Sequence, residues 1–346
     1  MLQSNFIISK IVEEQAKRVE GMGKVLLIYP PLHVDYGLWD DLKDDERVVL
    51  FNLTLKPING NLLKKIRSLH LSQRINRVIT LPFKEIWYDF SIFNKNVKTI
   101  SKVIVLDLAL ADSMVLKIVK KCRKKRILPN LFLINTLDSS VRAMKKVKSN
   151  MERIEWDHIY SFDKNDTDKY NIHYLSFCYY SLKKLPIINQ PQNDLFLIST
   201  LSPDREDLYM SLYKTLTDKG CKCDFNFCLY SELTPSVPIG VHLNKKRLPY
   251  KDTLFAMLNS RAILEVLRGS QSGPSLRYYE AVCYNKKLLT NNKEIVKFPY
   301  YDSRYMRIFS SLSDIDVEWI KKDDDVDYHY KGDFSPKFLI DFILSQ

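Results

Sequence analysis

The sequence predicts an α/β protein built from two Rossmann-like domains. Three observations favour this class. Short, continuous apolar runs recur along the chain, helical patterns lie between many of them, and the length of 346 residues suits two domains better than one. Apolar runs of this kind are typical of strands buried on both faces of a parallel sheet. Strands that alternate with helices form doubly wound sheets.

The first half of the chain contains six segments that we expect to be strands. Helical patterns separate several of these segments, at 62–69, 112–121 and 165–170. We therefore predict an N-terminal domain over residues 1–185, with one parallel sheet. Its expected strands are 24–29, 47–52, 77–81, 102–106, 130–134 and 161–163.

A stretch with two prolines and no periodicity predicts a linker at 186–193. The C-terminal domain is expected over 194–346, with strands at 194–199, 223–229, 261–267 and 287–290. Its helices are predicted at 205–219, at 250–259 and from Pro274 onward. A final amphipathic helix at 335–345 is expected either to cross back onto the N-terminal domain or to lie on a membrane surface.

Charge and composition narrow the class of partner. The net charge of +12 fits nucleic acid, an anionic membrane face or a phosphorylated substrate. The chain lacks the ~20-residue apolar run that crosses a bilayer and a signal-peptide pattern at its start. Its six cysteines lack zinc spacing, which indicates thiols in a reducing compartment. We expect a cytoplasmic protein, peripheral at the inner face of the plasma membrane, that does not bind nucleic acid.

The segment 268–280 is the strongest candidate for a binding site. Small residues at 269–273 lie just before an expected helix, and the N–H groups of a helix start attract phosphate. Ser275 offers a hydroxyl, and Arg277 offers a cationic fork for a diphosphate. Glu280 shares the helix face of Arg277 and could accept hydrogen bonds from a ribose diol. Alternatively, the glycines only shape a turn, and Arg277 and Glu280 form a surface ion pair.

Three segments resemble a family of bacterial lipopolysaccharide and capsular polysaccharide glycosyltransferases. Residues 260–266, 269–281 (Gly-Ser-Gln-Ser-Gly-Pro-Ser-Leu-Arg-Tyr-Tyr-Glu-Ala) and 285–292 (Asn-Lys-Lys-Leu-Leu-Thr-Asn-Asn) carry the resemblance. Residues 159–170 also resemble a segment of that family. Pro274 and Ser275 depart from its usual bulkier apolar residue and threonine, and the loop 199–205 lacks its glycine and lysine.

The resemblance implies a GT-B-type fold, with two domains facing a cleft and the sugar donor held by the C-terminal domain. The donor would be a nucleotide-sugar such as a UDP-, GDP- or CMP-sugar, with no further cofactor and no essential metal. The acceptor would be a glycan or a lipid-linked oligosaccharide. The implied donor-binding residues are Thr200, Arg205, Gly273, Ser275, Leu276, Arg277 and Glu280.

An inverting transferase also needs a base that deprotonates the acceptor hydroxyl. Asp107 is the first candidate, because it follows directly on an expected strand, and His33 is the second. A retaining enzyme needs neither residue. Three other functions stay open: a noncatalytic scaffold with this fold, a basic nucleic-acid-binding protein and a sugar-nucleotide epimerase.

Overall fold

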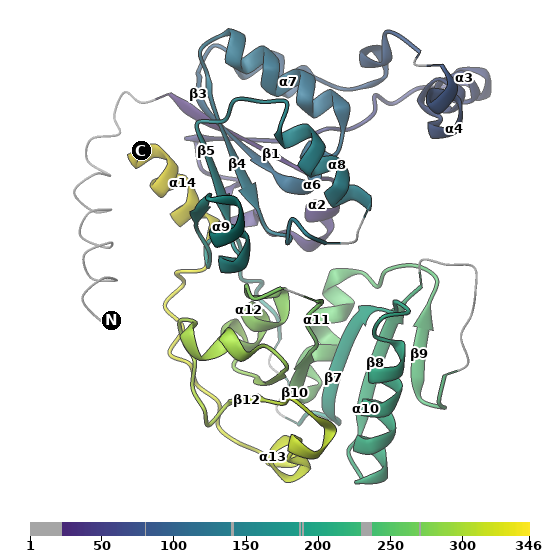
Figure 1. Cartoon of the computed structure of the whole chain (residues 1–346), viewed down its shortest axis with the longest axis vertical. Coiled ribbons are helices and arrows are strands. Elements are labelled where there is room, and N and C mark those ends of the chain that lie inside the picture. The colour runs from purple at the N-terminus through teal and green to yellow at the C-terminus, as the bar shows by residue number, and fades with distance from the viewer. Residues whose placement is uncertain are drawn as a thin grey trace. The chain divides into compact units, whose positions relative to one another are not determined.

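The computed structural model describes residues 23–79, 81–139, 142–186, 188, 190–229, 237–269 and 271–346. They form two compact units (Figure 1). The first unit holds the described residues up to Phe162 together with Asp166–Tyr179 and Pro336–Gln346. The second unit holds Asp163–Asn165 and Tyr180–Ser335. The main division thus falls between Tyr179 and Tyr180, several residues before the predicted linker.

The first unit is built on a six-stranded parallel sheet with the order β2-β1-β3-β4-β5-β6. Leu26 of β1 lies opposite Val49 on one side and Val103 on the other, so β1 is flanked by two strands. Its central strands are almost wholly apolar and buried, as the continuous runs predict. The strands are β1 (Lys24–Tyr29), β2 (Val48–Asn52), β3 (Ile100–Leu106), β4 (Leu128–Leu133), β5 (His158–Ser161) and β6 (His173–Tyr174).

Helices connect these strands. Of the described helices in this unit, the longest is α7 (Ser113–Lys124), which packs its apolar residues, including Val115 and Val119, into the core. Asp112 caps it by accepting a hydrogen bond from the N–H of Met114 at 2.8 Å. The other helices are α2 (Leu32–Tyr36), η1 (Asp40–Leu42), α3 (Asn61–Leu71), α4 (Gln73–Val78), η2 (Lys84–Trp87), α5 (Ser91–Asn96), α6 (Asp107–Leu110), α8 (Arg142–Met151) and α9 (Lys164–Tyr170).

The second unit repeats the architecture with a parallel sheet of order β12-β11-β10-β7-β8-β9. Its strands are β7 (Asn193–Thr200), β8 (Cys223–Cys228), β9 (Val241–Asn244), β10 (Ser260–Glu265), β11 (Lys287–Thr290) and β12 (Met306–Ile308). Its helices are α10 (Glu206–Asp218), α11 (Tyr250–Leu258), α12 (Leu276–Cys283), η3 (Lys293–Lys297), η4 (Leu312–Asp314) and α13 (Val317–Lys321). The predicted α/β class with two Rossmann-like domains is confirmed.

The last helix, α14 (Pro336–Ser345), belongs to the first unit. Its apolar residues Leu339, Ile340 and Ile343 are at most 1% exposed. Asp341 pairs with Arg47 at 2.6 Å, and the Phe342 ring packs against Tyr160 with 5.5 Å between centroids. The buried face of α14 is therefore not free to lie on a lipid surface.

Three element predictions differ from the structure. The strand expected at 161–163 overlaps β5 (His158–Ser161) only at Ser161. The described residues within 77–81 do not continue the sheet: α4 covers Gln73–Val78, and the following Ile79 is 63% exposed. An apolar run alone cannot distinguish a buried strand from an exposed apolar surface. The helix expected from Pro274 begins two residues later, at Leu276.

Among the described residues, no helix is both long and apolar enough to cross a membrane.

Candidate functional site

The carboxyl end of β10 is organised by the buried carboxylate of Glu265. This carboxylate accepts hydrogen bonds from the Ser275 hydroxyl and, at 2.5 Å, from the Thr290 hydroxyl at the end of β11. Burial raises the pKa of Glu265, and these hydrogen bonds oppose the rise. Glu265 therefore ties the loop before α12 to two neighbouring strand ends.

A second buried carboxylate, Asp163 of the second unit, holds the same loop from another side. It accepts hydrogen bonds from the N–H of Ser272 at 2.8 Å, the hydroxyl of Ser272 at 2.5 Å and the N–H of Gly273 at 3.2 Å. The N–H of Gly273 is therefore already engaged within the protein. The predicted anion-binding turn is a fixed structure rather than a set of free donors.

Ser275 is the N-cap of α12, with Leu276 as the first helical residue. Its hydroxyl oxygen accepts a hydrogen bond from the N–H of Arg277 at 3.1 Å, while its proton goes to Glu265. Ser275 thus caps the helix and does not hold its hydroxyl proton free for a phosphate. The cap fixes the direction in which α12 presents Arg277 and Glu280.

Arg277 and Glu280 form a buried pair, so the alternative of a surface ion pair is wrong. Nη1 of Arg277 lies 2.6 Å from Oε2 of Glu280, and the two side chains are 12% and 0% exposed. The two groups are close but not aligned as a hydrogen bond. Oε2 of Glu280 and Nη1 of Arg277 are both buried without a hydrogen-bond partner among the described residues. Such atoms are rare in folded proteins and require an explanation.

The other oxygen of Glu280 is held by a tyrosine that the sequence did not point to. The Tyr250 hydroxyl donates to Oε1 at 2.9 Å, and the Tyr180 hydroxyl lies 2.9 Å from that of Tyr250. Because Tyr250 donates to Glu280, Tyr180 donates to Tyr250. Burial raises the pKa of Glu280 to about 7, although the positive charge of Arg277 and the hydrogen bond from Tyr250 lower it.

Arg205 and Thr200 lie at the carboxyl end of β7, where the guanidinium makes contacts within the protein. Arg205 donates to the carbonyl oxygens of Val266 and Thr200, each at 3.1 Å, and its burial lowers its pKa. It therefore joins the end of β7 to the segment after β10. The nearby charge of Arg268 also lowers the pKa of Arg205. Arg268 is half-buried, and sequence reasoning did not single it out as a source of positive charge.

Asp107, the first candidate base, is a buried structural carboxylate in the first unit. It accepts hydrogen bonds from the N–H groups of Leu108, Ile134 and Asn135 at 2.6, 2.9 and 2.7 Å, and from Nδ2 of Asn135 at 3.0 Å. Burial raises its pKa to about 6, against the effect of these hydrogen bonds. Asp107 links the end of β3 to the segment after β4, and these contacts account for its position.

His33, the second candidate base, lies in α2 and is 4% exposed. Nε1 of Trp39 donates to its Nδ1 at 3.3 Å, and burial lowers its pKa to about 3. When Nδ1 accepts this hydrogen bond, the neutral ring carries its proton on Nε2. The low pKa and this tautomer make His33 a poor proton acceptor at neutral pH.

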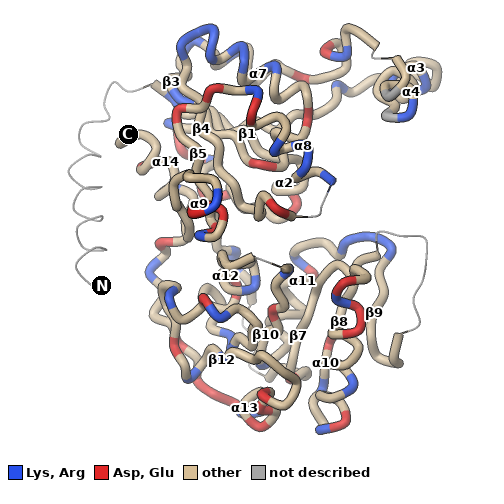
Figure 2. Tube along the Cα trace, viewed as in Figure 1, with Lys and Arg blue, Asp and Glu red and all other residues tan. Residues whose placement is uncertain are grey.

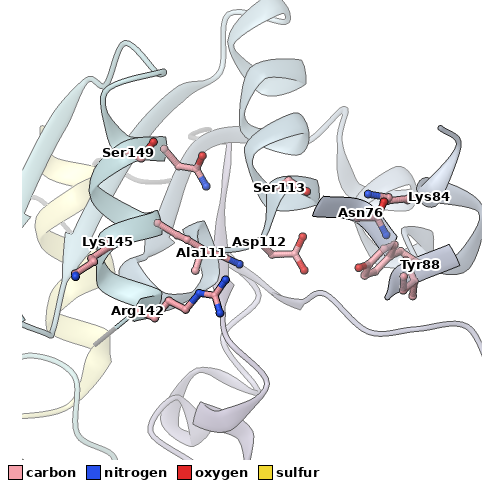
Figure 3. A pocket seen from close by; sticks show the side chains of 12 residues that line it. Asn76, Lys84, Tyr88, Ala111, Asp112, Ser113, Arg142, Lys145 and Ser149 are labelled. Atoms are coloured by element: carbon pink, nitrogen blue, oxygen red, sulfur yellow. The ribbon is translucent and has the colours of Figure 1, made fainter. Parts of the chain in front are cut away.

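The first unit contains a pocket of about 710 Å³ beside the N-terminus of α7. Lys84, Arg142, Lys145 and Lys146 all line it, and so does the carboxylate of Asp112. Figure 3 shows Arg142 and Asp112 facing the same space. Four cations around one cavity favour an anionic ligand. No set of three or more His, Cys, Asp or Glu side chains suited to a metal occurs in the described ranges.

No family model and no curated protein matches this chain. Three of the solved structures similar to it are glycosyltransferases. A kitacinnamycin glycotransferase is 10% identical, with a TM-score of 0.39 and coverage of 87% of this chain and 89% of that one. The spinosyn rhamnosyltransferase SpnG, complexed with thymidine diphosphate, is 8% identical, with a TM-score of 0.34 and coverage of 77% and 80%. UGT89C1 of Arabidopsis thaliana, complexed with quercetin, is 11% identical, with a TM-score of 0.36 and coverage of 81% and 74%. At these low identities and TM-scores, the function has to be inferred from the residues of this chain.

Proposed function

We propose that this protein is a glycosyltransferase whose second unit binds a nucleotide-sugar. The buried Arg277–Glu280 pair carries the proposal. It leaves one carboxylate oxygen and one guanidinium nitrogen without hydrogen bonds in α12, the helix that follows the carboxyl end of β10. Ligands bind at that end of the strands in open α/β sheets. A ribose hydroxyl beside a diphosphate offers a hydrogen-bond donor to Oε2 and an acceptor to Nη1, which otherwise face only each other.

The pair also suggests how the donor binds. Arg277 covers Glu280 and is itself slightly exposed. A diphosphate is a strong partner for a guanidinium, because charge-assisted bonds to phosphate are short and can be bidentate. We infer that the diphosphate draws Arg277 away from Glu280 and that the ribose diol then donates to Oε2. Tyr250 keeps Oε1 in place throughout.

Negative charge develops on the leaving nucleotide diphosphate as the sugar departs. Arg277, the half-buried Arg268 and the N-terminus of α12 supply positive potential on this side of the sheet. In this proposal they stabilise the leaving group without a metal.

We propose the cationic pocket of the first unit as the acceptor site. Its four cations suit a glycan or lipid-linked acceptor that carries phosphate or carboxylate groups. Asp112 lines this pocket, whereas Asp107 is buried among N–H donors. Asp112 is therefore the better candidate for the base of an inverting reaction. The resemblance at 269–281 supports a role in the synthesis of surface polysaccharides in the cytoplasm.

Titration calorimetry with nucleoside diphosphates tests the donor site. We expect UDP, GDP or CDP to bind more tightly than its nucleoside, and Glu280→Gln to weaken binding about 10- to 100-fold through loss of a hydrogen bond to a charged group. Glu294→Gln is the matched control, because Glu294 is exposed and pairs with Lys297.

Two results would refute the donor site. One is the absence of binding for every nucleoside diphosphate. The other is an equal affinity in the wild type and in Glu280→Gln, measured with both proteins folded.

A further inference from the structure

A separate arm projects from the first unit between β2 and α5. We define the arm as residues 56–87, which contain α3, α4 and η2. An antiparallel bridge between Leu55 and Tyr88 closes its base, where the N–H of Lys56 donates to the carbonyl oxygen of Trp87 at 2.8 Å. Figure 1 shows α3 and α4 lying away from the sheet of this unit.

The arm has its own internal contacts. His70 of α3 connects two distant parts of it: Nε1 of Trp87 donates to Nδ1 at 2.7 Å, and Nε2 lies 2.7 Å from the carbonyl oxygen of Pro82. Asn76 adds hydrogen bonds to the carbonyl oxygens of His70 and Ser72 at 2.9 and 2.7 Å. The arm is therefore a fixed structural element that can present a surface.

That surface is strongly apolar. Helix α3 has no buried residue, and its leucines and isoleucine at 62, 63, 66 and 69 share one face at helical spacing. Leu62 is 72% exposed. Val78 and Phe83 are 84% and 74% exposed, and Phe83 holds a left-handed backbone with φ 57° that disfavours large side chains. Nine large apolar side chains of the arm or its base are exposed: Leu55, Leu62, Leu63, Ile66, Leu69, Val78, Ile79, Phe83 and Ile86.

The charge of the arm has a single sign over most of its length. Residues 56–84 contain seven lysines and arginines and no aspartate or glutamate. Lys65 and Arg67 flank the apolar stripe of α3 on either side. Figure 2 shows blue segments, which mark lysine and arginine, in the α3 and α4 region. Exposed apolar residues bordered by cations fit a partner surface that has an apolar interior beneath negatively charged groups.

We propose that the arm docks on a membrane containing anionic lipids. Leu62, Ile66 and Leu69 enter the boundary between headgroups and acyl chains, while Lys65 and Arg67 lie among the headgroups. Single-stranded nucleic acid would need aromatic platforms for its bases, whereas the exposed face of α3 is aliphatic. The docking proposal does not depend on sugar transfer.

Sedimentation of the full-length protein with vesicles tests the proposal. The probes are vesicles of phosphatidylcholine alone and of phosphatidylcholine with phosphatidylglycerol, at low ionic strength. We expect binding to the anionic vesicles. The variant Lys65→Glu/Arg67→Glu should lower the partition coefficient by roughly 30-fold or more, since each cation near an anionic surface contributes about 1 kcal/mol.

Two further variants separate surface docking from general charge attraction. Leu62→Gln/Ile66→Gln/Leu69→Gln keeps good helix formers and every charge, and it should also lose binding. Lys120→Glu/Lys124→Glu makes the same charge change at exposed positions of α7 in the same unit, and it should keep binding. Circular dichroism establishes that each variant is folded.

Three results would overturn the proposal: no binding of the wild type to anionic vesicles, equal losses in the two charge variants, or unchanged binding in the glutamine variant. A wild type that binds an oligonucleotide but no vesicle would favour a nucleic-acid partner instead. UDP affinity, measured in solution without vesicles, reports the donor site separately. The two proposals can therefore fail independently.

Discussion

At the scale of single residues, Glu280 makes the folded protein sensitive to pH. Its pKa of about 7 lies well above the ordinary value of 4.5. Between these pH values the folded protein keeps a proton that the unfolded chain has released. The contribution of Glu280 to the free energy of unfolding therefore falls as pH rises from about 4.5 to 7.

Glu280→Gln should remove this part of the pH dependence. We expect urea denaturation to show that the variant gains stability relative to wild type as pH increases through that window. Glu294→Gln, at an exposed position, should follow the wild-type curve. Parallel curves for wild type and Glu280→Gln would show that Glu280 has an ordinary pKa.

Several contacts of the candidate site could not be predicted from the sequence, because they join residues that are far apart along the chain. Arg277 and Glu280 are three positions apart, so helical spacing predicts their proximity. Tyr250 is 30 positions from Glu280, and Asp163 is 109 positions from Ser272. No local pattern connects such partners. Only the folded chain shows that Asp163, Glu265 and Tyr250 fix the predicted turn and helix, and that Ser275 donates its proton inward.

At the scale of elements, continuous apolar runs predicted most central strands closely. The predicted 24–29 and 287–290 match β1 and β11 residue for residue. Short edge strands such as β6 and β12 have too few residues to give a pattern. The failure at 77–81 has a different origin, because its apolar residues belong to the exposed arm rather than to a core.

Helix α14 should be essential to the stability of the first unit. Ile340 is fully buried, and we expect Ile340→Ala to destabilise that unit by about 2–5 kcal/mol through lost burial and a cavity. Phe338→Ala, at a side chain that is 40% exposed, should cost much less. Urea unfolding of both variants checks this, and similar losses would show that α14 does not pack as described.

At the scale of the whole molecule, two units with separate cores should respond separately to a ligand of one of them. Calorimetry should resolve two unfolding transitions. A nucleoside diphosphate should shift only the transition of the second unit to higher temperature. At 100 times its dissociation constant, it should increase the free energy of unfolding of that unit by about 2.7 kcal/mol.

Trp319 identifies that transition, because it is the only tryptophan of the second unit; Trp39, Trp87 and Trp156 belong to the first. A variant that keeps Trp319 and replaces the other three with phenylalanine reports on the second unit by fluorescence. A ligand shift in a variant that retains only the tryptophans of the first unit would place the nucleotide elsewhere.

The position of α14 also sets an order of events during synthesis on the ribosome. Residues of the first unit emerge first, yet the helix that completes its core is translated only after residue 335. The second unit, whose residues end at Ser335, is complete before that helix exists. Until α14 is synthesised, the first unit therefore exposes the apolar surface that Leu339, Ile340 and Ile343 later cover. We expect chaperones to bind this surface during synthesis.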